Sequence, residues 1–188
     1  MKKSTAMARA ALMAIAALVP AAAHAGIGGF GTWWDTKDYG DMYGGGGKLG
    51  LGLGLGFWIE ARGSYLESKD HKIADVSLIP LEAIVGWQLE VSEILRPYVG
   101  AGFGYYVKDF EWKSEWKEWK DEFKSKDCAG YFALAGLNLN LDSSISIFGE
   151  AKYNLIGEDD KLEWRGSDMK EKYSFDGLSV NVGLKIGF

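Results

Sequence analysis

The sequence predicts an all-β fold, an eight-stranded antiparallel up-and-down transmembrane β-barrel with short periplasmic turns and long extracellular loops. Three observations lead to this prediction. Apolar residues alternate with polar or small ones in eight separate segments, the periodicity of strands with two different faces. After residue 25, no stretch of about 18 consecutive apolar residues could form a transmembrane helix. The connections between the segments are alternately short and long, as in barrels of the bacterial outer membrane.

The first 25 residues have the three parts of a secretory signal. Three basic residues precede an apolar run, Ala10 to Pro20, and residues 21–25 read AAAHA, with small residues at positions −3 and −1 of a cut after Ala25. The apolar run is shorter than the ~20 residues of a transmembrane helix, which disfavours the alternative of a retained N-terminal helix. We therefore predict a cleaved signal peptide over residues 1–25 and an outer-membrane β-barrel domain over residues 26–188.

The composition of the predicted mature chain excludes several classes of function. It contains 26 acidic and 18 basic residues, a formal charge of −8 with no basic stretch, so we expect no nucleic acid partner. The lone Cys128 cannot form an internal disulfide, and we interpret it as a small packed residue at a strand start rather than a reactive thiol. There is no phosphate loop and no metal-ligand spacing, so we expect neither a cofactor nor a metal.

Alternation is clearest in the last predicted strand, where six apolar residues share one face and small or polar residues occupy the other. These six are Leu178, Val180, Val182, Leu184, Ile186 and Phe188. Similar patterns predict seven further strands, the first of which has faces blurred by glycine: residues 26–35, 48–55, 57–65, 77–89, 97–108, 131–141 and 145–155. Strands of ~9–11 residues are long enough to cross a bilayer, and an even strand number is typical of bacterial outer-membrane barrels.

The connections separate into two groups. Short turns are predicted at residues 56, 90–96 and 142–144, and long charged loops at residues 37–47, 67–76, 109–127 and 157–172. With both termini in the periplasm, every long loop is extracellular.

A water-soluble barrel of the lipocalin type would show the same alternation with the leucines inside. The aromatic carboxy-terminus and the glycine-rich opposite face favour the membrane barrel instead. In hydrocarbon, each unpaired backbone group costs several kcal/mol, so the sheet must close on itself.

Two segments resemble a known family. Residues 96–106 read RPYVGAGFGYY, and the chain ends in GLKIGF. They resemble the small outer-membrane β-barrel superfamily of the OmpA transmembrane domain, OmpX and OmpW, part of the porin family of the Gram-negative cell envelope. The resemblance implies outer-membrane localisation, contact with outer-membrane lipid and lipopolysaccharide, and recognition by the barrel assembly machinery through a C-terminal signal of Leu184, Ile186 and Phe188. It does not imply one activity, because the group includes anchors, adhesins, small channels and lipid-modifying enzymes.

Seven charged residues fall on predicted lumen faces. The interior of an eight-stranded barrel is narrow enough for side chains to fill it, and charges there must pair or be hydrated. We predict a polar plug in which Glu82 and Glu150 pair with nearby bases, and a gated ion path is the alternative. The predicted network consists of Lys48, Glu60, Arg62, Glu82, Glu150, Lys152 and Lys185, with Glu60 and Lys185 nearer the periplasm than the rest.

The loop at 109–127 carries an aromatic stripe, Trp112, Trp116, Trp119 and Phe123, with the spacing of one helix face. Two interpretations stay open. The segment forms an amphipathic helix at the outer leaflet or against a partner, or the flanking strands extend as a hairpin with tryptophan at the membrane interface.

Three functions are compatible with this reading. The first is a structural or surface-interaction role, with a surface ligand that the sequence does not identify. The second is a small channel or transporter for small or apolar solutes, as in the OmpW group. The third is a lipid A-modifying acyltransferase or deacylase, for which the candidates are His71 with Asp70 and Ser68. Since a single loop histidine beside an aspartate is usually just solvated, we expect no enzyme and no catalytic residues.

Overall fold

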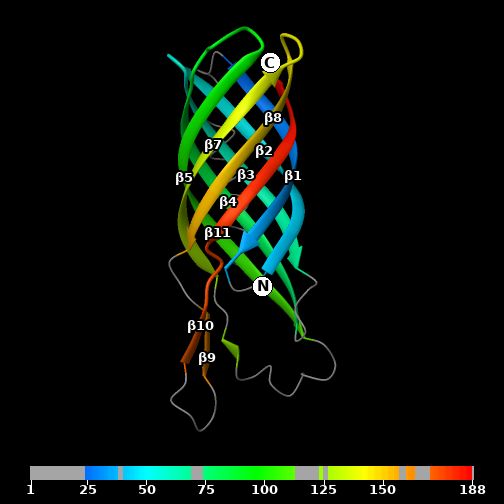
Figure 1. Cartoon of the computed structure of the whole chain (residues 1–188), viewed down its shortest axis with the longest axis vertical. Helices are drawn as coiled ribbons and strands as arrows, with labels where there is room; N and C mark the ends of the chain where they lie inside the picture. The colour runs from blue at the N-terminus through cyan, green and yellow to red at the C-terminus, as the bar shows by residue number, and fades with distance from the viewer. Residues whose placement is uncertain are drawn as a thin grey trace, which may run out of the picture.

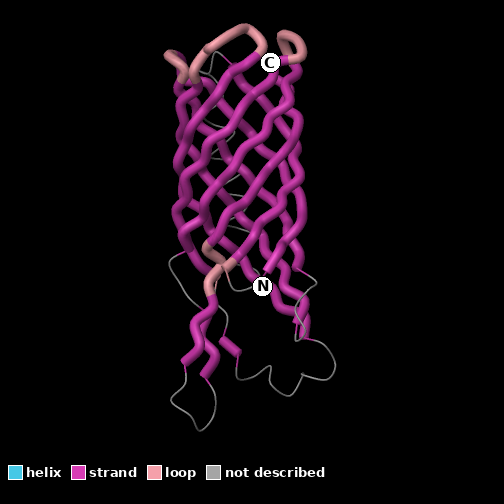
Figure 2. Tube along the Cα trace, viewed as in Figure 1, coloured by secondary structure: helices cyan, strands magenta, loops and turns pink. Residues whose placement is uncertain are grey.

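The computed structural model describes residues 24–37, 40–68, 74–112, 123–124, 127–156, 160–163 and 170–187. Eight antiparallel strands form a closed barrel in the order β1-β2-β3-β4-β5-β7-β8-β11 and back to β1 (Figures 1 and 2). The predicted all-β, eight-stranded barrel is therefore confirmed. No helix among the described residues is long and apolar enough to cross a membrane.

The barrel strands are β1 His24–Thr36, β2 Gly40–Gly54, β3 Phe57–Ser68, β4 Ala74–Gln88, β5 Leu95–Trp112, β7 Cys128–Asn140, β8 Ile145–Ile156 and β11 Gly177–Gly187. A separate three-stranded sheet, in the order β10-β9-β6, consists of β6 Phe123–Lys124, β9 Asp160–Glu163 and β10 Lys170–Tyr173.

Pairing of the first and last strands closes the sheet. The β1–β11 ladder runs from Gly26 opposite Gly187 to Thr36 opposite Gly177. Closure leaves no strand edge in the wall, as hydrocarbon requires, because a lipid-exposed edge would leave backbone groups without hydrogen bonds.

The two ends of the barrel differ. The β2–β3, β4–β5 and β7–β8 turns lie at one end, together with the end of β11 (top of Figure 1); we call this the turn end and the opposite one the loop end. In the β2–β3 turn, Leu55 and Gly56 both have positive φ, 53° and 81°, as type I′ hairpin turns require. In the β7–β8 turn, the Asp142 carboxylate accepts hydrogen bonds from the backbone N–H groups of Ser144 (2.6 Å) and Ile145 (2.7 Å).

The prediction of a long loop over residues 37–47 is wrong, because β2 already begins at Gly40. The glycines in this stretch pair on both sides, Gly46 with Phe30 of β1 and with Ser64 of β3. A Cβ at Gly46 would overlap the carbonyl oxygen of Gly63. The charged residues of this stretch favour a loop, but its glycines lack side chains and allow neighbouring strands to approach closely.

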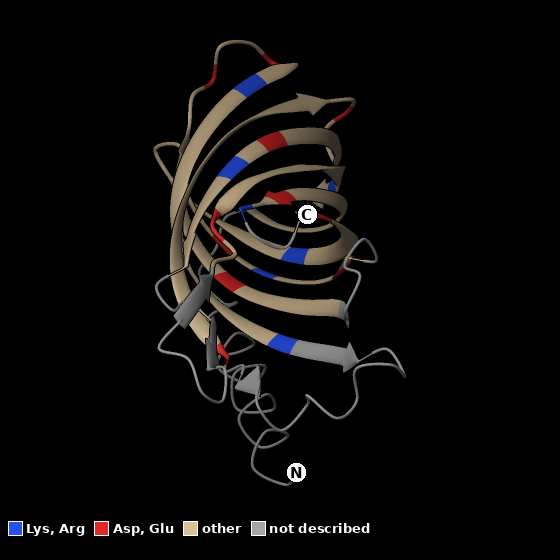
Figure 3. Cartoon of the chain, turned by 60° about the horizontal axis from the view of Figure 1, so that its bottom comes forward, with Lys and Arg blue, Asp and Glu red and all other residues tan. Residues whose placement is uncertain are grey.

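Inward and outward positions alternate along each strand. On β11, Leu184 and Val182 face outward and are 54% and 58% exposed, whereas Ser179 and Asn181 face the lumen and are at most 1% exposed. Acidic and basic positions are spread over successive strands of the wall (Figure 3). The charged side chains that are buried therefore lie inside the barrel, where they form the candidate site.

Candidate functional site: the barrel lumen

Six charged side chains form a layer across the lumen, which we call the ion-pair layer. All six are at most 8% exposed, and the three bases balance the three acids. They project inward from four strands, β2, β3, β4 and β8: Lys48, Glu60, Arg62, Glu82, Glu150 and Lys152.

Arg62 is the centre of this layer. Its two terminal nitrogens donate to the two carboxylate oxygens of Glu150, one of them at 2.9 Å, and its Nε donates to Glu60 Oε1 at 2.5 Å. The second oxygen of Glu60 lies 3.4 Å from Lys48 Nζ. A bidentate arginine–carboxylate pair fixes both partners in one plane, so Arg62 and Glu150 connect opposite sides of the wall rigidly.

Neutral side chains donate the remaining hydrogen bonds to the Glu150 carboxylate. Tyr98 Oη donates to Oε2 and Asn181 Nδ2 to Oε1, both at 2.8 Å. Thr32 Oγ1 in turn donates to Asn181 Oδ1 at 2.6 Å. Every oxygen of this buried carboxylate is therefore satisfied, which a buried charge needs in order to be tolerated. Tyr98, Asn181 and Thr32 were not among the predicted site residues, although alternation places all three on lumen faces.

A second pair joins Lys152 Nζ to Glu82 Oε1. The cations of the layer also lie over aromatic faces. Lys152 Nζ is 4.8 Å from the ring centre of Phe132, and Lys48 Nζ is 3.3 Å from that of Phe148. Such contacts stabilise desolvated cations by about 2 kcal/mol.

The seventh predicted network residue, Lys185, does not join the layer. It lies on β11, where its neighbours across the ladders are Gly28 and Ser146. It forms no ion pair or hydrogen bond within the part of the chain that the structure describes, and its side chain is half-buried. The structure thus assigns it to a different part of the lumen from the other six.

The loop end of the lumen contains an apolar cluster, a feature that the predicted polar plug did not include. Nine buried residues form this loop-end cluster: Trp34, Met42, Leu66, Val76, Leu78, Tyr106, Cys128, Ile156 and Phe175. Cys128 packs at the start of β7 and is 2% exposed. The sequence contained a signal for this cluster, because apolar residues occupy both faces of the strands near their loop ends.

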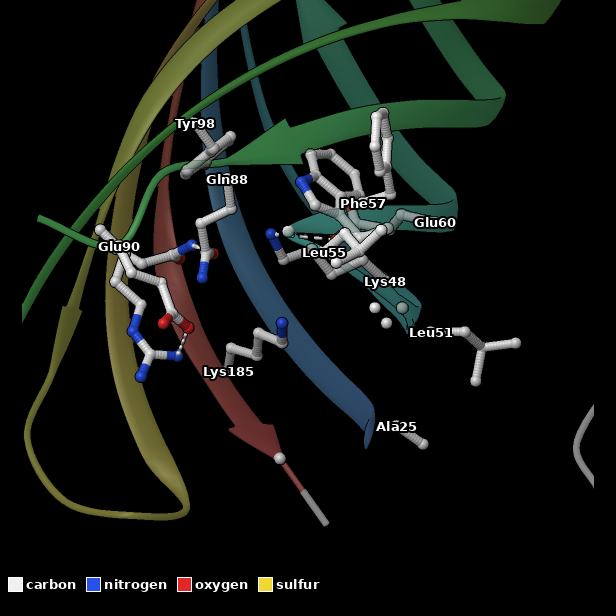
Figure 4. A pocket seen from close by; sticks show the side chains of 18 of the residues that line it. Ala25, Lys48, Leu51, Leu55, Phe57, Glu60, Gln88, Glu90, Tyr98 and Lys185 are labelled. Carbon is white, nitrogen blue, oxygen red and sulfur yellow. Dashed lines mark hydrogen bonds and ion pairs between the residues drawn. The ribbon is translucent and has the colours of Figure 1, made fainter. Parts of the chain in front are cut away.

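The turn end of the lumen is hollow. A cavity of about 570 Å³ extends from the ion-pair layer to the turns, and we call it the turn-end cavity (Figure 4). Lys48, Glu60 and Arg62 form its inner limit, and Lys185 and Arg96 line it near the turns. The lumen therefore has three parts in series: an apolar cluster, an ion-pair layer and a cavity lined by both charged and apolar side chains.

The remaining predicted site residues lie outside the lumen. Leu184 and Ile186 of the C-terminal signal face outward from β11, and Phe188 lies outside the described residues. Of the aromatic stripe, Trp112 ends β5 opposite Ala74, and Phe123 belongs to β6. The remaining two, Trp116 and Trp119, lie outside the described residues.

The end of β5 bears on the two interpretations of the stripe. Beyond Tyr106, β5 continues as a strand whose only partner among the described residues is β4, because the β5–β7 ladder ends at Tyr106 opposite Cys128. At Trp112 the chain is therefore an extended strand, on the β4 side.

The described part of the chain does not test the predicted catalytic candidates as a group. His71 and Asp70 lie outside the described residues, and Ser68 is buried at the end of β3. Among the residues that the structure describes, no group of three or more His, Cys, Asp or Glu side chains could hold a metal ion.

Comparison with known proteins identifies the family. The family model described as "Outer membrane protein beta-barrel domain" matches residues 5–186. The chain belongs to this family. Membership locates the protein in an outer membrane. No curated protein sequence matches the chain significantly.

Solved structures of outer-membrane barrels share the fold. OprG from Pseudomonas aeruginosa is 16% identical with a TM-score of 0.69, and the match covers 89% of this chain and 96% of OprG. The E. coli outer membrane protein W is 15% identical with a TM-score of 0.56, covering 89% and 98%. Ail from Yersinia pestis, in complex with the heparin analogue sucrose octasulfate, is 14% identical with a TM-score of 0.54, covering 88% and 97%. At these identities the likeness concerns the fold alone.

Proposed function

We propose that this outer-membrane barrel is a structural or surface-interaction protein with a plugged lumen that does not conduct ions. The observation that carries the proposal is the presence of two closures in series. The ion-pair layer occupies the middle of the lumen, and the loop-end cluster occupies the extracellular side. Either one alone would hinder a hydrated ion, and an ion that crosses the barrel must pass both.

The two closures oppose an ion in different ways. Trp34, Met42 and Tyr106 in the loop-end cluster offer few polar partners, so an ion there loses its hydration without replacement, at a cost of several kcal/mol. In the ion-pair layer, an ion must separate pairs such as Arg62–Glu150, whose side chains are at most 1% exposed. Breaking such a pair costs ~3–5 kcal/mol.

Conductance in a planar bilayer tests the plug. We expect the native protein to show no steady conductance. Replacing Tyr106, Glu82 and Lys152 together by alanine removes parts of both closures and should produce leakage. A Glu93→Gln variant, changed at an exposed position in the β4–β5 turn, keeps both closures and serves as the matched control. Steady native conductance of porin size would refute the plug and favour the second function.

The surface-interaction part of the proposal rests on the loop end. The small sheet joins two different long loops, because Phe123 of β6 pairs with Leu162 of β9. Paired loops form a more rigid surface for a ligand than separate ones. Ail, of similar fold, was solved with a heparin analogue; the acidic composition of this chain disfavours such polyanions as its own surface ligand. Replacing residues 113–122 by a short glycine–serine linker should abolish binding of a surface partner without affecting barrel folding.

The second candidate function is transport of small or apolar solutes. It is favoured by the turn-end cavity, which already opens part of the lumen, and by the apolar character of the loop-end cluster. Swelling of proteoliposomes in neutral solutes distinguishes it from the plug, because an uncharged solute can pass without ionic conductance. We propose no enzymatic activity, and the lipid A of a deletion strain should have an unchanged mass spectrum.

Export by a cleaved signal peptide and insertion by the barrel assembly machinery are parts of the same proposal. The predicted cut after Ala25 falls two residues inside β1, which begins at His24. N-terminal sequencing of protein from purified outer membranes should yield Gly26. Recovery of Met1 from that fraction would contradict the cut.

A further inference from the structure

We propose that the turn-end cavity is a binding site for small organic anions that enter from the periplasmic side. The turn end faces the periplasm in barrels of this family. The cavity, of about 570 Å³, lies within the range of pockets that bind small molecules. This inference is separate from the plug, because the cavity ends at the ion-pair layer and does not require passage through it.

The charge of the lining favours an anion. Four basic and two acidic side chains line the cavity: Lys48, Arg62, Arg96 and Lys185 against Glu60 and Glu90. Within the ion-pair layer, Glu60 is already shared between Lys48 and Arg62. The positive charge that remains without a close partner is therefore located near the turns, on Arg96 and Lys185.

Lys185 is the first of these two cations. It extends from β11 into the cavity (Figure 4), and within the described ranges it has no ion pair or hydrogen bond. Its side chain passes over Gly26, where an added Cβ would lie 2.7 Å from Lys185 Cε. If export cleaves the chain after Ala25, the new α-ammonium group of Gly26 adds a further positive charge beside Lys185.

Arg96, the second cation, is poorly neutralised. Its Nη1 lies 3.7 Å from Glu90 Oε1, and the Glu90 side chain is 72% exposed. An exposed ion pair at this distance neutralises the arginine only weakly, because water screens the interaction. The Nε–H of Arg96 is buried and, among the described residues, has no acceptor. The hydrogen-bonding capacity of this guanidinium is therefore not fully used by the protein.

The shape of the lining indicates the body of the anion. Trp58 and Tyr98 form an aromatic wall, with ring centres 5.9 Å apart in an edge-to-face arrangement. Gln88 and Asn138 are already hydrogen-bonded to each other at 2.8 Å. Apolar and aromatic surface beside two cations fits a small carboxylate or phosphate ester with an apolar or aromatic body.

The test uses 4-fluorobenzoate as the probe and the uncharged 4-fluorobenzamide as its matched comparison. Binding to the full mature barrel in uncharged detergent micelles is followed by ¹⁹F NMR, with heat modifiability as the check on folding. We expect saturable binding of the benzoate and binding of the benzamide weaker by about tenfold or more, because a charge-assisted hydrogen bond is lost.

Four variants locate the site. Lys185→Gln and Arg96→Gln should each weaken benzoate binding about tenfold, and Lys108→Gln, at the loop end, should leave it unchanged. Glu90→Gln removes a negative charge from the cavity lining and should tighten binding, an effect that misfolding cannot imitate. Equal binding of benzoate and benzamide, absence of saturation, or unchanged affinity in the Lys185→Gln, Arg96→Gln double variant would each overturn the proposal. None of these results depends on whether the native barrel conducts.

Discussion

Arg62 of β3 binds both carboxylate oxygens of Glu150, which lies 88 residues later on β8. In the strand order of the barrel, β3 and β8 stand four places apart in either direction. The pair therefore spans the full lumen and connects opposite walls. Because these side chains are at most 1% exposed, water does not screen the interaction, and the fold depends on both partners being present.

The Lys152–Glu82 pair gives the cleanest test of buried charge in this barrel, since each is the other's only ion-pair partner among the described residues. Glu82→Leu or Lys152→Met alone leaves an uncompensated charge and should destabilise the barrel by ~3–5 kcal/mol. Replacing both, as Glu82→Leu with Lys152→Met, should cost much less. Urea titrations in lipid vesicles measure all three; additive losses in the double variant would show that the two residues do not interact.

A second prediction concerns the lipid face. Leu137 and Val182 point outward and are about half exposed, so Leu137→Arg or Val182→Arg should destabilise the barrel by ~2–4 kcal/mol near the bilayer midplane. Leu137→Met, which keeps the apolar surface, is the control and should have little effect. The same folding titrations measure the difference. Arginine and methionine variants of equal stability would assign this face to water, as in a soluble barrel.

A third prediction concerns strain in the β2–β3 turn. Leu55 has φ of 53° and is 93% exposed, so it adopts a disfavoured backbone conformation without compensating burial. Leu55→Asn should stabilise the barrel by about 1 kcal/mol, because asparagine tolerates the left-handed region. Gly56→Ala should instead destabilise the barrel, since a Cβ there would overlap the carbonyl oxygen of Gln88. Destabilisation by the asparagine would indicate that Leu55 makes an important apolar contact in the membrane.

A fourth prediction concerns pH. Hydrogen bonds from the backbone of Ser144 and Ile145 hold the pKa of Asp142 below the ordinary value for aspartate. A carboxyl group with a depressed pKa stabilises the folded state above its unfolded pKa, and that contribution disappears as pH falls through the folded pKa. NMR titration of the Asp142 carboxyl should therefore give a midpoint below that of an aspartate in a peptide. An unshifted midpoint would show that the β7–β8 turn does not form these hydrogen bonds in solution.

A fifth prediction concerns assembly. The apolar face of β11 continues through Leu184 and Ile186 toward Phe188. Deletion of Phe188, or Phe188→Ser, should lower the yield of heat-modifiable barrel in the outer membrane and increase periplasmic degradation. Phe188→Tyr keeps the aromatic end and should assemble normally. Equal yields from all variants would remove Phe188 from the assembly signal.

The sequence by itself determined the strand number and the face on which each strand side chain lies. Period-2 alternation assigns Arg62, Glu82 and Glu150 to the lumen and Leu137 and Val182 to the lipid, because successive side chains of a strand point to opposite sides whatever the rest of the fold does. The need to pair every backbone group in hydrocarbon then requires closure. These properties are local or follow from the solvent, so they can be predicted without knowing which strands face one another.

Only the tertiary structure decided which lumen side chains pair with one another and how far along the barrel each of them lies. Alternation does not encode the stagger of a closed sheet, and stagger determines that Arg62 meets Glu150 across the lumen while Lys185 lies apart from the layer. The position of the glycines at the start of β2 likewise depends on tertiary structure. Only the approach of Ser64 on the neighbouring strand shows that Gly46 belongs in the wall, because there is no space for a larger side chain.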